Sequence, residues 1–82
     1  MAKLAPVRPA VLIAYFRDLG YREAGQEGSH LKMKKPGAPR PLVIPMHRTV
    51  SVGVILSNLR SAGVNRQDFK EWLGKRHAAG RG

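Results

Sequence analysis

The residues best suited to chemistry are histidines, of which this 82-residue chain has three. His30 directly follows Gly28 and Ser29, and His47 lies two residues after Pro45. A histidine side chain titrates near neutral pH, so it can accept the proton of an RNA 2′-hydroxyl or donate one to a departing 5′-oxygen. His30 is therefore either a proton-transfer residue, with Ser29 orienting either His30 or the scissile phosphate, or an exposed histidine without a chemical role. His47 is either a second proton-transfer group or a loop residue that hydrogen-bonds to the backbone.

Basic residues surround this candidate. The chain has 15 Lys and Arg against five Asp and Glu, a formal net charge of +10. No acidic residue lies between Gly28 and Gln67, and the basic residues of that interval are Lys32, Lys34, Lys35, Arg40, Arg48, Arg60 and Arg66. Such a run can be ordinary solvated surface. However, the positive charges repel one another and so destabilise the fold, and an external polyanion that binds them would offset this repulsion.

The basic residues nearest to His30 in the sequence indicate the kind of polyanion. We expect Lys32, Lys34, Lys35 and Arg48 to hold phosphates, which would make binding dependent on salt. No aromatic residue alternates with the basic run from Lys32 to Lys35, so stacking of bases is not indicated. The pattern therefore favours contacts with a nucleic-acid backbone.

Composition argues against several other kinds of protein. The chain has no cysteine, which excludes disulfides, thiolate metal sites and a cysteine nucleophile. No second histidine or carboxylate lies at metal-ligand spacing from His30, so we expect neither a metal nor a cofactor. A Ser-His-Asp hydrolase would need a nucleophile elbow, which is absent.

The longest apolar run, Val11 to Phe16, is far shorter than the ~20 residues of a membrane span. Without cysteines or a signal-peptide pattern, we expect a cytoplasmic protein with no membrane partner.

The hydrophobic pattern predicts the elements that position these residues. Residues 9–19 and 52–62 show helical spacing, and Gly20 and Gly63 are suited to end those helices. Residues 21–27, 30–35 and 42–44 are strand-like, with Pro45 closing the third, and in the second of these His30, Lys32 and Lys34 share one face. Asn65 with Asp68 indicates the start of a short last helix, and Ser51 is a candidate N-cap. Gly28 is expected to allow a backbone conformation that a side chain would forbid.

This order predicts an α+β fold, α-β-β-β-α with a short extra C-terminal helix, in which the helices pack on one face of a three-stranded antiparallel sheet. We divide the chain into an extended lead-in (1–8), one folded domain (9–73) and a flexible basic tail (74–82).

Five short motifs resemble the HicA mRNA-interferase toxins of bacterial type II toxin–antitoxin systems. In order they are Leu19-Gly20-Tyr21, Gly28-Ser29-His30, Val43-Ile44-Pro45-Met46-His47, Gly53, and Leu59-Arg60-Ser61-Ala62-Gly63. The resemblance covers roughly residues 9–73. It implies a fold like that of the double-stranded-RNA-binding domain, cleavage of mRNA by the histidine at position 30, and a HicB-like antitoxin protein as partner.

Three hypotheses follow from the sequence. In the first, the chain is a metal-independent endoribonuclease that uses His30 for acid–base chemistry. In the second, it is a non-catalytic module that binds double-stranded RNA through shape and phosphates alone. In the third, it is a structural partner of an acidic protein, and His30 is an exposed residue without a chemical role. RNA left intact by the pure protein in EDTA would favour the second hypothesis, and a lack of RNA affinity at low salt would favour the third.

Overall fold

The computed structural model describes the backbone of residues 3–81 and the side chains of residues 3–76. The elements follow in the predicted order: α1 (Pro9–Asp18), β1 (Arg22–Glu27), β2 (His30–Lys34), β3 (Leu42–Pro45), α2 (Val52–Ala62) and α3 (Arg66–Arg81). The strands form one antiparallel sheet in the order β1-β2-β3, with β2 in the centre. The predicted α+β class is therefore confirmed.

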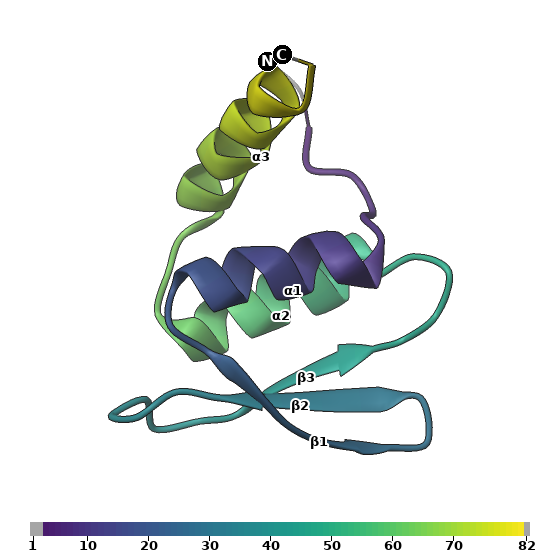
Figure 1. Ribbon diagram of the computed structural model, residues 1–82, viewed down its shortest axis with the longest axis vertical. Coiled ribbons are helices and arrows are strands. Elements are labelled where there is room, and N and C mark those ends of the chain that lie inside the picture. The colour runs from purple at the N-terminus through teal and green to yellow at the C-terminus, as the bar shows by residue number, and fades with distance from the viewer. Residues whose placement is uncertain (1–2, 82) are drawn as a thin grey trace.

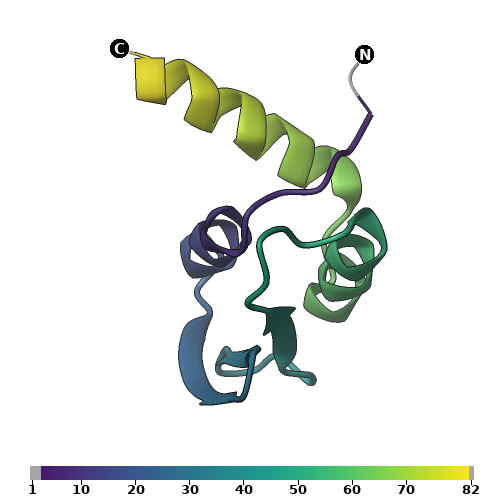
Figure 2. The same cartoon turned by 90° about the vertical axis from the view of Figure 1, so that its right-hand side faces the viewer.

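The central strand β2 separates the two faces of the sheet. Leu31 and Met33 are buried, whereas His30, Lys32 and Lys34 are exposed, as the alternation predicts. Figure 1 shows the helices on only one side of the sheet, and Figure 2 shows α1 and α2 side by side above it. The other face of β2 is thus left open by the described elements, and that face has the histidine and two lysines.

The core lies between the sheet and the two helices that cover it. Its fully buried side chains come from α1, from the residue before β1, from strands β2 and β3, from the loop before α2, and from both later helices: Leu12, Tyr15, Phe16, Tyr21, Met33, Leu42, Ile44, Val50, Ile55, Leu59 and Phe69. At ~1.5–3 kcal/mol for each large apolar side chain removed from water, this cluster is the main stabilising contribution of so small a chain.

Two loop residues fix the ends of α2. The Ser51 Oγ accepts a hydrogen bond from the Val54 N–H at 3.4 Å, so Ser51 is the N-cap as predicted. Gly63 ends the helix with φ +75°, a left-handed conformation that costs glycine little. The Val64 N–H then bonds to the Leu59 carbonyl at 3.0 Å, which satisfies one of the last carbonyls of α2.

The lead-in before α1 is attached to the loop that precedes α2. Val7 and Val50 form an isolated antiparallel bridge, with N–H to carbonyl distances of 3.2 Å from Val7 and 2.6 Å from Val50. Because Val50 is also fully buried, this bridge fixes the path of the loop between β3 and α2.

The last helix is longer than the sequence analysis predicts. A short helix ending near Leu73 and a flexible tail from Gly74 were expected, but α3 continues to Arg81. Gly74 costs the helix about 1 kcal/mol relative to Ala, and the Lys, Arg and Ala residues that follow it are good helix formers. The side chains beyond residue 76, which include part of the expected basic tail, lie outside the described residues.

Aromatic packing joins α3 to α1 and not to the sheet. The Tyr15 ring lies 4.8 Å from that of Phe69 and 5.3 Å from that of Trp72, measured between centroids. The Tyr15 hydroxyl donates to Asp68 at 2.5 Å, and the Trp72 indole N–H donates to Asp18 at 2.7 Å. The first turns of α3 are therefore fixed to α1, while the sheet remains covered by α1 and α2 alone.

A buried amide closes the outer edge of β3. Asn58 of α2 is only 6% exposed, and its Oδ1 accepts from the Val43 N–H at 3.1 Å. Its Nδ2 donates to the Val43 carbonyl at 3.0 Å and to the Val54 carbonyl at 3.2 Å. Asn58 thus makes the two hydrogen bonds that a further strand would make at Val43, and it connects β3 to α2 at the middle of the strand.

Candidate functional site

The predicted catalytic residues meet at one end of the sheet. His30 begins β2, opposite Glu27 of β1 and Pro45 of β3. The Ser29 carbonyl accepts the Met46 N–H at 2.6 Å, which joins the β1–β2 turn to the loop after β3. His47 and Arg48 follow in that loop, and both are exposed. The fold therefore brings two separate sequence motifs together around His30, and we call this region the His30 end.

The turn before His30 depends on glycine. Gly28 has φ +59°, and a Cβ built on it would meet nothing within 4 Å. The constraint at this position is consequently the backbone conformation and not space, since residues other than glycine rarely adopt positive φ. Ser29 is half-buried beside it, and its carbonyl bond to the Met46 N–H holds the entry to β2 in place.

The open face of β2 continues from His30 as a line of positive charge. Lys32 lies opposite Val43 and Gly25, and Lys34 lies opposite Arg22. Residues two apart on one face of a strand are about 6.6 Å from each other. Val43 is 40% exposed and Met46 39%, so apolar side chains border the lysines on the β3 side. This surface can hold a phosphate chain with His30 at one end of it.

Glu27 is the one acidic residue on this face, and the sequence analysis does not single it out. Glu27 lies directly before the interval from Gly28 to Gln67 that contains no acidic residue. The two-residue turn of Gly28 and Ser29 nevertheless pairs it directly with His30. Its carboxylate lies 3.9 Å from the Lys32 ammonium group, and both side chains are substantially exposed. A two-residue hairpin turn between positions 27 and 30 is the sequence signal that could have placed Glu27 on the basic face.

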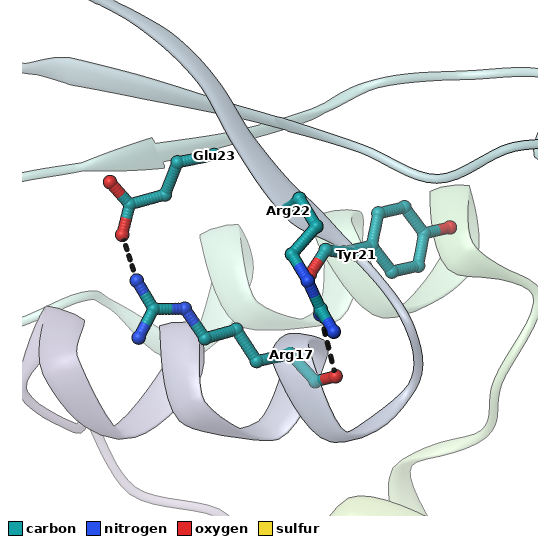
Figure 3. Close-up of polar contacts among 4 residues, drawn as sticks. All are labelled: Arg17, Tyr21, Arg22 and Glu23. Atoms are coloured by element: carbon teal, nitrogen blue, oxygen red, sulfur yellow. Dashed lines mark hydrogen bonds and ion pairs between the residues drawn. The ribbon is translucent and has the colours of Figure 1, made fainter.

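Three other acidic residues are bound on the helical side of the molecule. Glu23 forms an ion pair with Arg17 of α1, and beside it Arg22 donates to the Arg17 carbonyl at 3.3 Å, as Figure 3 shows. Asp18 and Asp68 accept the hydrogen bonds from Trp72 and Tyr15 described above. These carboxylates hold α1, β1 and α3 together, so they do not neutralise the open face of the sheet.

Lys35 does not join the other predicted phosphate-binding residues. It lies just past the end of β2, and its ammonium group is 5.7 Å from the centroid of the Tyr21 ring. Lys35 therefore sits at the opposite end of β2 from His30, whereas Lys32 and Lys34 are on the open face and Arg48 is in the loop of the His30 end.

The His30 end is an exposed surface and not an enclosed pocket. His30 and His47 are both exposed, and no hydrogen bond between them occurs within the side chains of residues 3–76. No group of three or more His, Cys, Asp or Glu that could hold a metal ion occurs in that part of the chain. Across residues 3–81, no helix is both long and apolar enough to span a membrane. The exposed imidazoles of His30 and His47 are groups that can transfer protons, and the neighbouring lysines are groups that can attract an anion.

Comparison with known proteins gives one match. The family model described as the HicA toxin of bacterial toxin–antitoxin systems matches residues 11–64, which extend from α1 to just past α2. The match contains the β1–β2 turn, His30, His47 and all the basic residues of the open face, and it stops before α3. No curated protein and no solved structure gives a significant match.

Proposed function

The chain belongs to the HicA toxin family of bacterial toxin–antitoxin systems, and from this premise we propose that it is an endoribonuclease that cleaves mRNA with His30. The observation that supports the proposal best is the position of His30. It stands at the end of a row of exposed lysines on a sheet face that the described elements leave open. Family membership implies an antitoxin partner, and we propose a HicB-like protein that covers this face.

In the proposed reaction the 2′-hydroxyl of the RNA attacks its own neighbouring phosphate. His30 accepts the hydroxyl proton as the new P–O bond forms, and the bond to the 5′-oxygen breaks. The departing 5′-oxygen takes up a proton, so the products are a 2′,3′-cyclic phosphate and a 5′-hydroxyl. Lys32 and Lys34 stabilise the charge that develops on the phosphate. The proton of the leaving group comes from protonated His30, from His47 or from water.

The neighbouring groups have positioning roles in this proposal. Ser29 fixes His30 through the turn and through its carbonyl bond to the Met46 N–H. Arg48, in the same loop as His47, holds a phosphate on the β3 side of His30. The reaction needs no metal ion, because each step is a proton transfer or a displacement at phosphorus next to fixed cations.

The test is incubation of the pure protein with single-stranded RNA in EDTA. We expect cleavage with cyclic-phosphate ends and no cleavage of an RNA whose 2′-hydroxyls are replaced by hydrogen. His30→Ala should bind the RNA and leave it intact. In a bacterial host without antitoxin, expression of the unaltered chain should arrest growth and His30→Ala should relieve the arrest. Equal toxicity of His30→Ala would reject the catalytic assignment, and intact RNA bound by the unaltered protein would identify a binding module.

A further inference from the structure

A groove lies at the end of the sheet opposite His30. It is formed by the 36–41 loop after β2, the last turn of α2 and Tyr21, and it has a volume of about 670 Å³. Figure 1 shows this loop and the β1–β2 turn at opposite ends of the sheet. With a rise of about 3.3 Å per strand residue, position 35 is roughly 16 Å from position 30 along β2. The groove is thus separate from the His30 end: it lies past the other end of β2, on the side of the sheet that α2 covers.

Three cations line the groove, namely Lys35, Arg40 and Arg60, and none of its lining residues is acidic. Lys35 is held over the Tyr21 ring. Within the side chains of residues 3–76, Arg40 and Arg60 take part in no ion pair or side-chain hydrogen bond. Arg60 has a partial structural role, because a cation in the last turn of α2 interacts favourably with the helix dipole. Arg40, in an exposed loop, has no such role.

The chemistry of these groups favours a phosphate. A guanidinium group donates two parallel hydrogen bonds to phosphate oxygens, which makes arginine the preferred residue for that contact. The volume is within the ~300–1,000 Å³ of small-ligand sites and can accept a phosphate with its sugar. Pro36, Ala38 and Pro39 supply apolar surface that a ribose or base can contact.

We infer that the groove binds a backbone phosphate of the RNA substrate, at a distance of several nucleotides from the bond that His30 cleaves. The inference rests on the proposed function. RNA is favoured over a free nucleotide because β2 connects the groove to His30 through the exposed Lys34 and Lys32. One RNA strand that follows the open face of β2 would contact the lysines in turn and would then bend round the end of the sheet, past the exposed loop of Arg40, into the groove. The groove then adds to the affinity for the RNA from outside the reacting site.

The test measures RNA affinity in the non-cleaving His30→Ala protein, with a fluorescently labelled single-stranded RNA long enough to reach from His30 to the groove. Arg40→Gln should lower the affinity about three- to tenfold and reduce the slope of log affinity against log salt by about 0.7. Lys75→Gln is the matched control, because it removes the same charge from an exposed position on α3 and should change the slope less. Arg40→Lys, which keeps the charge but loses the two-pronged contact, should recover part of the affinity.

A substrate too short to reach the groove distinguishes the contribution of the groove from that of the His30 end. In the active protein, Arg40→Gln should leave the cleavage of a dinucleotide unchanged, since a dinucleotide cannot span from His30 to the groove. Equal effects of Arg40→Gln and Lys75→Gln on the longer RNA would overturn the groove assignment alone. A chain that binds no RNA at all would overturn the proposed function as well. Unchanged RNA affinity with weaker binding of the antitoxin would identify the groove as a protein interface and also overturn the inference.

Discussion

The two ends of β2 differ in both shape and chemistry. The His30 end is an exposed surface made by two turns, with two histidines and one carboxylate, Glu27, beside a lysine. The other end is a groove lined by Lys35, Arg40 and Arg60, with no carboxylate and no histidine. One end therefore has groups that transfer protons, and the other has only groups that hold anions.

In the proposed function, this difference assigns reaction to one end of the sheet and anchoring of the RNA to the other. An 82-residue chain has no room for an enclosed site that could do both. Strand β2 connects the two ends, because residues two apart on its open face, His30, Lys32 and Lys34, lead from one end of the sheet toward the other. Changes at the two ends should consequently affect different measured quantities, whereas changes between them should affect both.

The largest effect on stability is expected midway between the ends, at Asn58. Asn58→Leu would leave the N–H and carbonyl of Val43 without partners at the edge of β3, at a cost of about 1–3 kcal/mol for a buried polar group. Chemical denaturation should show this loss, and both RNA affinity and the cleavage rate should fall as β3 loosens. Ser57→Ala, at the exposed neighbouring position of α2, should stay within ~0.5 kcal/mol. Loss of only one of the two activities would contradict the role of Asn58 in holding both ends.

The stability of the fold is expected to depend on pH, in part through Tyr21 at the groove end. Burial raises the pKa of Tyr21 above its ordinary value of 10.0, and burial together with Asp68 raises the pKa of Tyr15 further. The folded chain therefore retains tyrosine protons that the unfolded chain loses, so stability is fully present below pH 10.0 and falls as the pH rises above it. Each tyrosine contributes at most about 1.4 kcal/mol per pH unit.

Tyr21→Phe keeps the ring under Lys35 but removes the titrating hydroxyl, so the fall in stability above pH 10.0 should become shallower. The measurement is the free energy of unfolding by denaturant at a series of alkaline pH values. An unchanged slope would show that Tyr21 ionises equally well in the folded chain, which its 2% exposure argues against.

The smallest effect is expected at the His30 end, from the removal of its carboxylate. Glu27→Gln frees Lys32 and removes a charge that repels phosphate, and exposed pairs of this kind are worth ~0.2–1 kcal/mol. RNA affinity should therefore rise about two- to fivefold at low salt and less at high salt. Glu71→Gln makes the same charge change on α3, where Glu71 bonds to Gln67, and should have a weaker effect. A similar gain from both variants would mean that only net charge matters.

The sequence predicted which face of β2 contains His30. Leu31 and Met33 alternate with polar residues, so burying these two side chains places His30, Lys32 and Lys34 on the exposed face. It also predicted the N-cap Ser51 and the end of α2 at Gly63, since both follow from local backbone chemistry. Family resemblance supplied what the pattern alone could not, namely that His30 rather than His47 is the first candidate for catalysis.

Features that depend on register and on packing across the fold were not predictable in the same way. Glu27 faces Lys32 only because the turn pairs positions 27 and 30. The helical pattern of residues 52–62 gives no sign that Asn58 bonds to β3. The alternation of residues 30–35 separates Lys35 from Lys32 and Lys34, but it gives no sign that the Tyr21 ring lies beneath the Lys35 ammonium group. The groove likewise joins three separate segments, residue 21, residues 35–40 and residues 60–63, and no local signal marks their contact.

The most direct test of the account is the single-turnover rate of RNA cleavage, measured in EDTA as a function of protein concentration. His30→Ala should lower the maximal rate by at least ~10²-fold and leave the half-saturating concentration nearly unchanged. Arg40→Gln should raise the half-saturating concentration and leave the maximal rate unchanged. Cleavage by His30→Ala at the rate of the unaltered chain would contradict the claim that proton transfer occurs at the His30 end.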